Sequence, residues 1–205
     1  MIFKKFKIGE LFSINPSNTY GSNIKDDMII SEEGTTPYIT NTINNNGLGG
    51  YSVFQPNNKG NAITLSDTVT SVHETIYYQK KDFIGKSHLQ VLRPLLINDG
   101  EEEKELFSLT ERTAIYIITS MKKSVKTGEF DYGTKFNRDA IRDTFISLPV
   151  KEKKDKVPDL EYMDNYIKNL IPRYFKVLDM EVEKLKERNE KYKRELKPII
   201  DELVG

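Results

Sequence analysis

The sequence VLDMEVEKLKERNEKYKRELKPIIDELVG (residues 177–205) decides the architecture, because its apolar residues recur at alternating spacings of four and three. This heptad spacing places them in one narrow seam along a helix, with charged residues on both flanks. A seam this narrow packs better against another helix than against a broad sheet. The seam positions are Leu178, Val182, Leu185, Asn189, Tyr192, Leu196, Ile199 and Leu203. We expect a coiled-coil helix that dimerises through these residues, and Ile171 and Phe175 extend its register backward.

The partner helix is expected from a second chain, because the sequence contains no other heptad run. An antiparallel pair would hold two globular bodies about 50 Å apart, at about 1.5 Å per helical residue. That separation corresponds to about one to one and a half turns of B-DNA. Asn189 either fixes the register and number of helices or is simply tolerated near a helix end.

Three prolines are expected to shape the helical part of the chain. A helix with its own apolar stripe is expected to open at Pro158 and to remain anchored to the body of the protein. Pro172 predicts a kink or break between that helix and the seam, and Pro198 predicts a bent or frayed last turn.

Residues 1–157 are expected to form a globular body of a different kind. Short β-rich runs such as PYITNTI (37–43) and LQVLRPLLI (89–97) alternate with turns rich in Asn and Gly. The segment NNNGLGG (44–50) lies between two such runs, which is typical of a hairpin. We therefore expect an α+β fold, in which a curled β-rich domain with packed helices precedes a helical linker and coiled-coil helix at 158–205.

Two helices are predicted within the body. The segment LFSLTERTAIYIITSM (106–121) carries apolar residues at helical spacing from Leu106 onward, with Ile115 among those that widen the apolar face. The short segment RDAIRD (138–143) follows Asn137, whose side chain can cap a helix. An extended segment is expected after this second helix.

The composition argues against several classes of function. The 205 residues carry a net charge of zero, so overall charge gives no support for nucleic-acid binding. There is no cysteine and there are only two histidines, His73 and His88, so neither a disulfide nor a metal site is expected. No P-loop, nucleophile elbow or His-Glu-x-x-His motif occurs, and catalysis is not expected. With no long apolar run and no signal peptide, we expect a soluble cytoplasmic protein.

Three polar segments could contact DNA, and each also has an ordinary structural reading. The asparagines of 44–50 can read adenine edges or merely form a turn. The segment TSVHETIYYQKKDFIGKSHLQ (70–90) gathers hydroxyl groups and cations that suit backbone contacts, although solvated loops look the same. The segment YGTKFNRDAIRD (132–143) adds a lysine and an arginine, but Asn137 can act only as a cap and Arg138 can pair with a nearby acid.

Five stretches resemble, in their order and spacing, the target recognition domains of restriction-modification specificity subunits. They are TPYITNTINNNGLGGY (36–51), GNAITLSDT (60–68), IYYQKKDFIGKSHLQVLRP (76–94), YGTKFNRDAIRDTFISLPV (132–150) and PDLEYMDNYIK (158–168). The resemblance covers about residues 5–171. It is to the domain of type I S subunits and to its relatives in type IIG and type IIB systems.

The resemblance implies a DNA-reading module without catalysis of its own. In such systems two recognition domains, held apart by paired antiparallel helices, read the two halves of a split site. Modification subunits dock on the helices and bring S-adenosylmethionine for adenine N6 methylation, and restriction subunits attach in type I systems. The implied DNA-facing residues are Thr40, Asn41, Asn44, Asn45, Asn46, Thr70, Ser71, His73, Lys86, Ser87, His88, Lys135, Asn137 and Arg138.

This chain carries one recognition domain and one spacer helix, which resembles half of a type I S subunit. A homodimer with two-fold symmetry would rebuild the full arrangement and would read identical, inverted half-sites. Two other functions remain open at this point. A protein–protein adaptor or DNA mimic with a coiled-coil scaffold would suit the neutral charge, although only residues 101–105 are densely acidic. An independent enzyme would need an acid–base or nucleophile pair, which the sequence does not provide.

Overall fold

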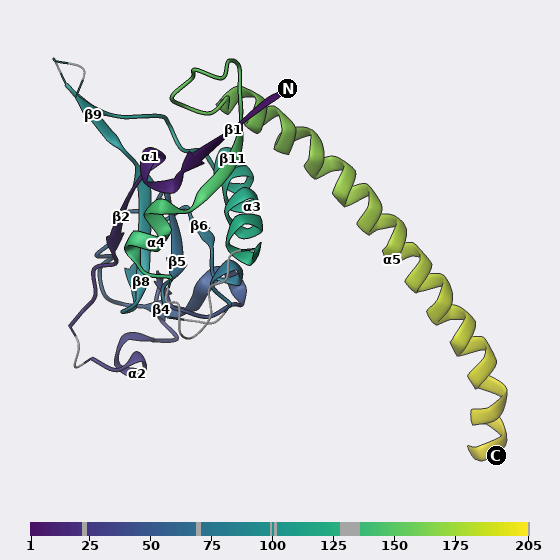
Figure 1. Ribbon diagram of the computed structural model, residues 1–205. Helices are drawn as coiled ribbons and strands as arrows, with labels where there is room; N and C mark the ends of the chain where they lie inside the picture. The colour runs from purple at the N-terminus through teal and green to yellow at the C-terminus, as the bar shows by residue number, and fades with distance from the viewer. Residues whose placement is uncertain (22–23, 69–70, 99, 101, 128–135, 205) are drawn as a thin grey trace. The chain divides into compact units, whose positions relative to one another are not determined.

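The computed structural model describes residues 1–205 except 22–23, 69–70, 99, 101, 128–135 and 205, and it describes residues 198–204 without their side chains. The chain divides into two compact units, Met1–Asp164 and Asn165–Gly205 (Figure 1). The first unit is rich in short strands and the second is helical. The α+β class expected from the sequence is confirmed.

A four-stranded antiparallel sheet is the largest sheet among the described residues. Its strands, in spatial order, are β2 (Phe12–Pro16), β8 (Leu89–Pro94), β5 (Ala62–Ser66) and β6 (Tyr77–Gln79). All five residues of β5 are buried, as expected of a central strand covered on both faces. Ile63 pairs with Leu92 on one side and with Tyr78 on the other.

A three-stranded sheet carries the hairpin that the asparagine-rich turn predicts. Its strands are β4 (Leu48–Ser52), β3 (Thr36–Ile39) and β7 (Ile84–Gly85), with β3 antiparallel to β4 and parallel to β7. The 3-10 turn η1 (Asn45–Gly47) joins β3 to β4, and Asn45 and Asn46 have φ of 49° and 55°. Asparagine tolerates this left-handed conformation, so the turn chemistry predicted for this segment is confirmed.

Two smaller antiparallel pairs complete the strands of the described chain. They are β1 (Ile2–Lys7) with β11 (Phe145–Val150), and β9 (Leu96–Asn98) with β10 (Glu103–Glu105). The short helices of the first unit include α1 (Ile8–Leu11), α2 (Asp26–Ile29) and the 3-10 turn η2 (Val72–Glu74). In Figure 1 the β9 strand and the N-terminus lie at one end of this unit and α2 lies at the other.

Helix α3 (Glu111–Thr127) begins five residues later than the sequence pattern suggested. Thr110 ends the preceding extended segment, because its Oγ1 accepts from the backbone N–H of Thr113 at 3.2 Å while Thr113 Oγ1 accepts from the N–H of Thr110 at 2.9 Å. This reciprocal cap sets the first helical turn. Leu106 therefore lies outside the helix, and Ile115 is 39% exposed and does not widen the buried face.

The largest of three hydrophobic clusters among the described residues of the first unit joins sheets to helices. Ile117 and Met121 of α3 are fully buried against residues of the large sheet, of β11 and of the helix α4 (Arg138–Asp143). Met163, near the start of the last helix, is fully buried in the same core. The anchoring that the sequence predicted for the region after Pro158 is thereby confirmed.

Helix α5 (Leu160–Val204) is one continuous helix of 45 residues. Its first turn is capped by Asp159, whose Oδ1 accepts from the backbone N–H of Tyr162 at 3.0 Å. Of the kink or break predicted at Pro172, the break is wrong, and the helix also runs through Pro198. A proline removes one backbone hydrogen bond and crowds the preceding turn. The remaining hydrogen bonds of a long helix are enough to carry it across that local defect.

Candidate nucleic-acid interface

The turn at residues 86–88, between β7 and β8, is fixed by three other segments of the chain. Its three carbonyl oxygens accept, in chain order, from Ser17 Oγ at 2.7 Å, Asn41 Nδ2 at 3.0 Å and the backbone N–H of Asp67 at 3.1 Å. The last residue of the turn, His88, has a φ of 64°, which is uncommon for a residue with a Cβ atom. The structure thus brings the Asn41 loop and the end of β5 to the 86–88 turn.

A polar network lies directly beside this turn. Gln90 Nε2 donates to Asp67 Oδ2 at 2.6 Å, and His88 Nδ1 lies 3.4 Å from the other carboxylate oxygen, Asp67 Oδ1. That second contact is at ion-pair distance and is not a hydrogen bond. Among the described residues, three buried acceptor atoms therefore have no donor, namely Asn41 Oδ1, Asp67 Oδ1 and Gln90 Oε1. Buried acceptors normally have a donor, so these three atoms mark the turn as a place where water or a bound ligand can supply one.

Lys86, expected to hold a DNA phosphate, is already engaged in an ion pair. Its Nζ donates to Asp26 Oδ2 at 2.5 Å, and the hydroxyl of Tyr38 donates to Asp26 Oδ1 at 2.8 Å. The hydrogen bond from Lys86 lowers the pKa of Asp26, while burial and the same carboxylate raise the pKa of Tyr38. These bonds attach α2 to β3 and to the 86–88 turn.

Asn46 is one of the residues that hold the loop after β3. Its Nδ2 donates to the carbonyl of Tyr78 at 3.1 Å, and its own carbonyl accepts from Gln79 Nε2 at 3.1 Å. The side chain of Asn46 is thus used in fixing the loop to β6. The exposed side chains of Asn44 and Asn45 lie at the turn of the same loop, where they can reach a ligand.

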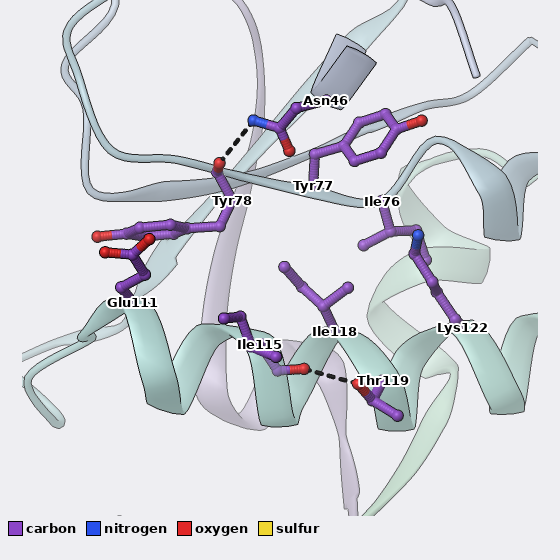
Figure 2. A pocket seen from close by; sticks show the side chains of 9 residues that line it. All are labelled: Asn46, Ile76, Tyr77, Tyr78, Glu111, Ile115, Ile118, Thr119 and Lys122. Atoms are coloured by element: carbon purple, nitrogen blue, oxygen red, sulfur yellow. Dashed lines mark hydrogen bonds between the residues drawn. The ribbon is translucent and has the colours of Figure 1, made fainter. Parts of the chain in front are cut away.

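A groove of about 420 Å³ separates β6 from α3, with Asn46 at its rim (Figure 2). Lys122 projects into it from α3, and its Nζ lies 5.1 Å from the centre of the Tyr77 ring. Burial lowers the pKa of Lys122, whereas the negative charge of Glu74 opposes that shift. A partly desolvated cation between an aromatic ring and the apolar surface of α3 is suited to an anionic ligand.

The other sequence-predicted residues lie apart from this turn or outside the described residues. Ser71 directly precedes η2 and His73 lies within it, and η2 lies next to α3. Asn137 caps α4, since its Oδ1 accepts from the backbone N–H of Ala140 at 3.0 Å, and Arg138 is exposed in the first turn of that helix. The structural reading of Asn137 is thus confirmed, and α4 packs against α1 and β2. Thr70 and Lys135 lie outside the described residues.

Three residues of this region were not predicted from the sequence. Asp67 and Gln90 lie at the ends of buried strands, and Lys122 lies within an amphipathic helix. A polar glutamine inside the apolar run LQVLRP was the one available signal, because a buried amide requires a partner.

The predicted dimerisation residues follow one face of α5. Leu178, Val182, Leu185, Tyr192 and Leu196 are all large and exposed, with 52% of Leu185 open to solvent. Asn189 is exposed in the same row. Ile199 and Leu203 lie in the helix, but their side chains are outside the described part. Lysine–glutamate pairs spaced three residues apart, such as Lys184 with Glu181 at 3.0 Å, flank the row.

Within the residues that the structure describes, no group of three or more His, Asp or Glu side chains is arranged to hold a metal ion. The same residues include no helix that is both long and apolar enough to span a membrane.

Comparison with known proteins gives a family match. Residues 2–173 match the sequence model of the family described as "Type I restriction modification DNA specificity domain". A search of curated proteins found no match.

Solved structures share the fold at low sequence identity. The S subunit of the type I restriction-modification system from M. genitalium is 16% identical, with a TM-score of 0.53 over 87% of this chain and 42% of that chain. A chain from a study titled "Structural basis underlying complex assembly and conformational transition of the type I R-M system" is 14% identical, with a TM-score of 0.56 over 88% of this chain and 41% of that chain. This protein therefore spans about two fifths of the length of these structures.

Proposed function

The chain belongs to the family of type I restriction-modification DNA specificity domains, and we propose that it is a specificity subunit that reads one half of a bipartite DNA site. The observation that supports DNA reading best is the 86–88 turn, where segments distant in sequence fix one exposed set of polar groups. Exposed asparagines of the neighbouring loop, Asn44 and Asn45, supply amides suited to base edges.

The second half of the site is read, in this proposal, by a second copy of the chain. The support is the exposed row on α5, because a heptad seam left in water favours pairing with another helix. An antiparallel pair of α5 helices would present two identical recognition domains in inverted orientation. The target would then be a symmetric bipartite sequence around an unread gap.

The paired helices also serve as the platform for the catalytic partners. We expect adenine-N6 methyltransferase subunits to dock there and to supply S-adenosylmethionine, while this chain has no catalytic role of its own. Restriction subunits are a further partner of the assembled complex. We expect this assembly to act in the cytoplasm, where it would meet its DNA substrate.

The proposal is tested by mapping methylated adenines in the host genome with and without the gene for this chain. Loss of one bipartite motif with identical inverted halves is the expected result. An unchanged set of methylated motifs would overturn the DNA-specificity role. Loss of a motif with unlike halves would instead contradict the homodimer alone.

A further inference from the structure

We infer that Asp67 and Gln90 are positioning residues that fix the tautomer of His88, and that Nε2 of His88 reads a base edge as a hydrogen-bond acceptor. This inference rests on the proposed function only in placing DNA at the 86–88 turn. It names the atom that contacts the base, Nε2 of His88, its role as a hydrogen-bond acceptor and the bases that this role selects.

The backbone of the turn is fixed at the residue that carries the His88 imidazole. Each of the three carbonyls of residues 86–88 is held by a donor from a different segment, and His88 adopts its left-handed φ of 64° within that frame. Unfavourable backbone geometry persists where the surroundings determine it, and such sites are often functional. The His88 side chain is 62% exposed, so a ligand can reach the edge of the ring that faces away from Asp67.

Asp67 selects the tautomer. A carboxylate only accepts hydrogen bonds, and Asp67 Oδ1 is buried without a hydrogen-bond donor in the described structure, with His88 Nδ1 3.4 Å away. A proton on Nδ1 points its positive end toward this oxygen, whereas a lone pair there would be repelled, so electrostatics favours the Nδ1–H tautomer although the contact is not a hydrogen bond. A neutral imidazole with Nδ1–H has its free lone pair on Nε2.

Gln90 keeps the carboxylate in place. It is only 4% exposed, and its Nε2 donates to Asp67 Oδ2 at 2.6 Å. Turning the amide over would set its carbonyl oxygen against the carboxylate, so the observed orientation is the favourable one. The buried amide therefore leaves Asp67 Oδ1 as the carboxylate oxygen that faces His88.

An acceptor at Nε2 requires a donor on the base. In the major groove the donors are the exocyclic amines of adenine (N6) and cytosine (N4), whereas guanine presents only the acceptors N7 and O6. His88 is therefore expected to favour adenine or cytosine at one position of each half-site. Guanine at that position would leave two acceptors facing each other.

The substitution Asp67→Asn gives a sharp test because it retains shape and reverses one hydrogen-bonding role. The amide oxygen can still accept from Gln90, while its NH₂ group faces His88 Nδ1 and favours the tautomer with the proton on Nε2. Nε2 then becomes a donor, which suits guanine. The variant is expected to change the preferred base, whereas His88→Ala is expected to lose about 2- to 10-fold of discrimination at that position, the effect of one hydrogen bond.

Nitrogen-15 NMR of the full-length protein reads the tautomer without DNA. The chain has only two histidines, so His73 serves as the internal reference, and His73→Gln assigns the two signals. The expected neutral form of His88 carries its proton on Nδ1 in the natural protein and on Nε2 in Asp67→Asn. A proton on Nε2 in the natural protein, or the same tautomer in both, would overturn the positioning role.

Selection of DNA sites by the assembled methyltransferase complex tests the reading role. A changed base at one half-site position in Asp67→Asn, and a degenerate one in His88→Ala, support it. An unchanged motif in His88→Ala would overturn the reading while leaving the proposed function intact. If the natural complex selected no sequence at all, both the proposed function and the base-reading role of His88 would be wrong. Thermal unfolding of each variant, compared with His73→Gln, detects loss of the fold.

Discussion

Lys86 Nζ lies 2.5 Å from Asp26 Oδ2, so the lysine that the family resemblance assigns to DNA phosphate is paired with a carboxylate on α2. Both side chains remain more than a third exposed, which limits the stability that the pair contributes. The pair attaches α2 to the 86–88 turn, and a phosphate at this turn would have to share or replace the carboxylate. Its two members are therefore expected to affect stability and DNA affinity differently.

Asp26→Asn should lower the free energy of unfolding by about 0.5–1 kcal/mol at pH 7. The pKa of Asp26 is lowered in the folded protein, chiefly by the hydrogen bond from Lys86, so its stabilising effect is complete above the unfolded pKa near 3.9. This contribution is lost as the pH falls through the lowered folded value. Urea denaturation should show the difference between natural protein and variant at pH 7 and its decline as the pH is lowered below about 3.9. A difference that persists in acid would contradict the ion-pair explanation.

Lys86→Met should reduce DNA affinity for all sequences alike and should reduce the slope of log affinity against log salt by about one. The reason is that a phosphate contact carries charge but no sequence information. Lys81→Met is the matched control, because Lys81 is an exposed lysine outside the 86–88 turn. Binding titrations at several salt concentrations measure both slopes. Equal effects of the two substitutions would show that Lys86 makes no specific contact with a DNA phosphate.

Asn137 can be tested for its two alternative roles by comparing two substitutions. Asn137→Ala removes the cap of α4 and should cost about 1 kcal/mol, whereas Asn137→Ser retains a capping oxygen and should cost little. Serine lacks the amide that would read adenine bidentately. A DNA-reading role therefore predicts weak binding by the stable Asn137→Ser protein, measured beside its urea denaturation curve. Unchanged binding by that protein would leave Asn137 as a cap alone.

The sequence was sufficient for features that depend on local rules. The Asn45–Asn46 turn and the Asn137 cap follow from backbone preferences of single residues, and the structure has both. Periodicity placed the α3 region but not its start, because the Thr110–Thr113 reciprocal cap competes with the apolar pattern that begins at Leu106. The heptad row likewise marked α5 but not its continuity through Pro172, since one lost hydrogen bond is small beside the rest of a long helix.

The candidate interface was harder to predict, because its defining contacts join residues far apart in the chain. Asp67 reaches His88 and Gln90 only through the pairing of β5 with β8. Lys86 looked like a free cation in sequence, and its carboxylate partner is 60 residues away. Pairings of this kind depend on strand order and register, which no local pattern specifies.

Lys122→Met should stabilise the fold by a few tenths of a kcal/mol at pH 7, and at most about 0.5. Burial lowers the pKa of Lys122 in the folded protein, so the charged form is disfavoured there at every pH below that lowered value. This cost is lost as the pH rises from the lowered folded pKa to the unfolded pKa of about 10.4. Urea denaturation at pH 7 and pH 11 should therefore show the gain only at the lower pH. Lys123→Met, at an exposed neighbour on α3, is the control, and a loss of stability in Lys122→Met would show that the contact with Tyr77 outweighs desolvation.

The seam on α5 should determine the oligomeric state. Leu185→Lys places a charge in the row on both helices of a pair, and losing two buried leucines costs about 3 kcal/mol or more, which raises the dissociation constant at least about 100-fold. Met180→Lys is the matched control, because Met180 is equally exposed but lies outside the heptad row. Sedimentation velocity at micromolar concentration should find dimers for the natural protein and Met180→Lys, and monomers for Leu185→Lys. Dimers of Leu185→Lys would show that the chains associate through another surface. Monomers of the natural protein would show that the seam binds a partner other than a second copy of this chain.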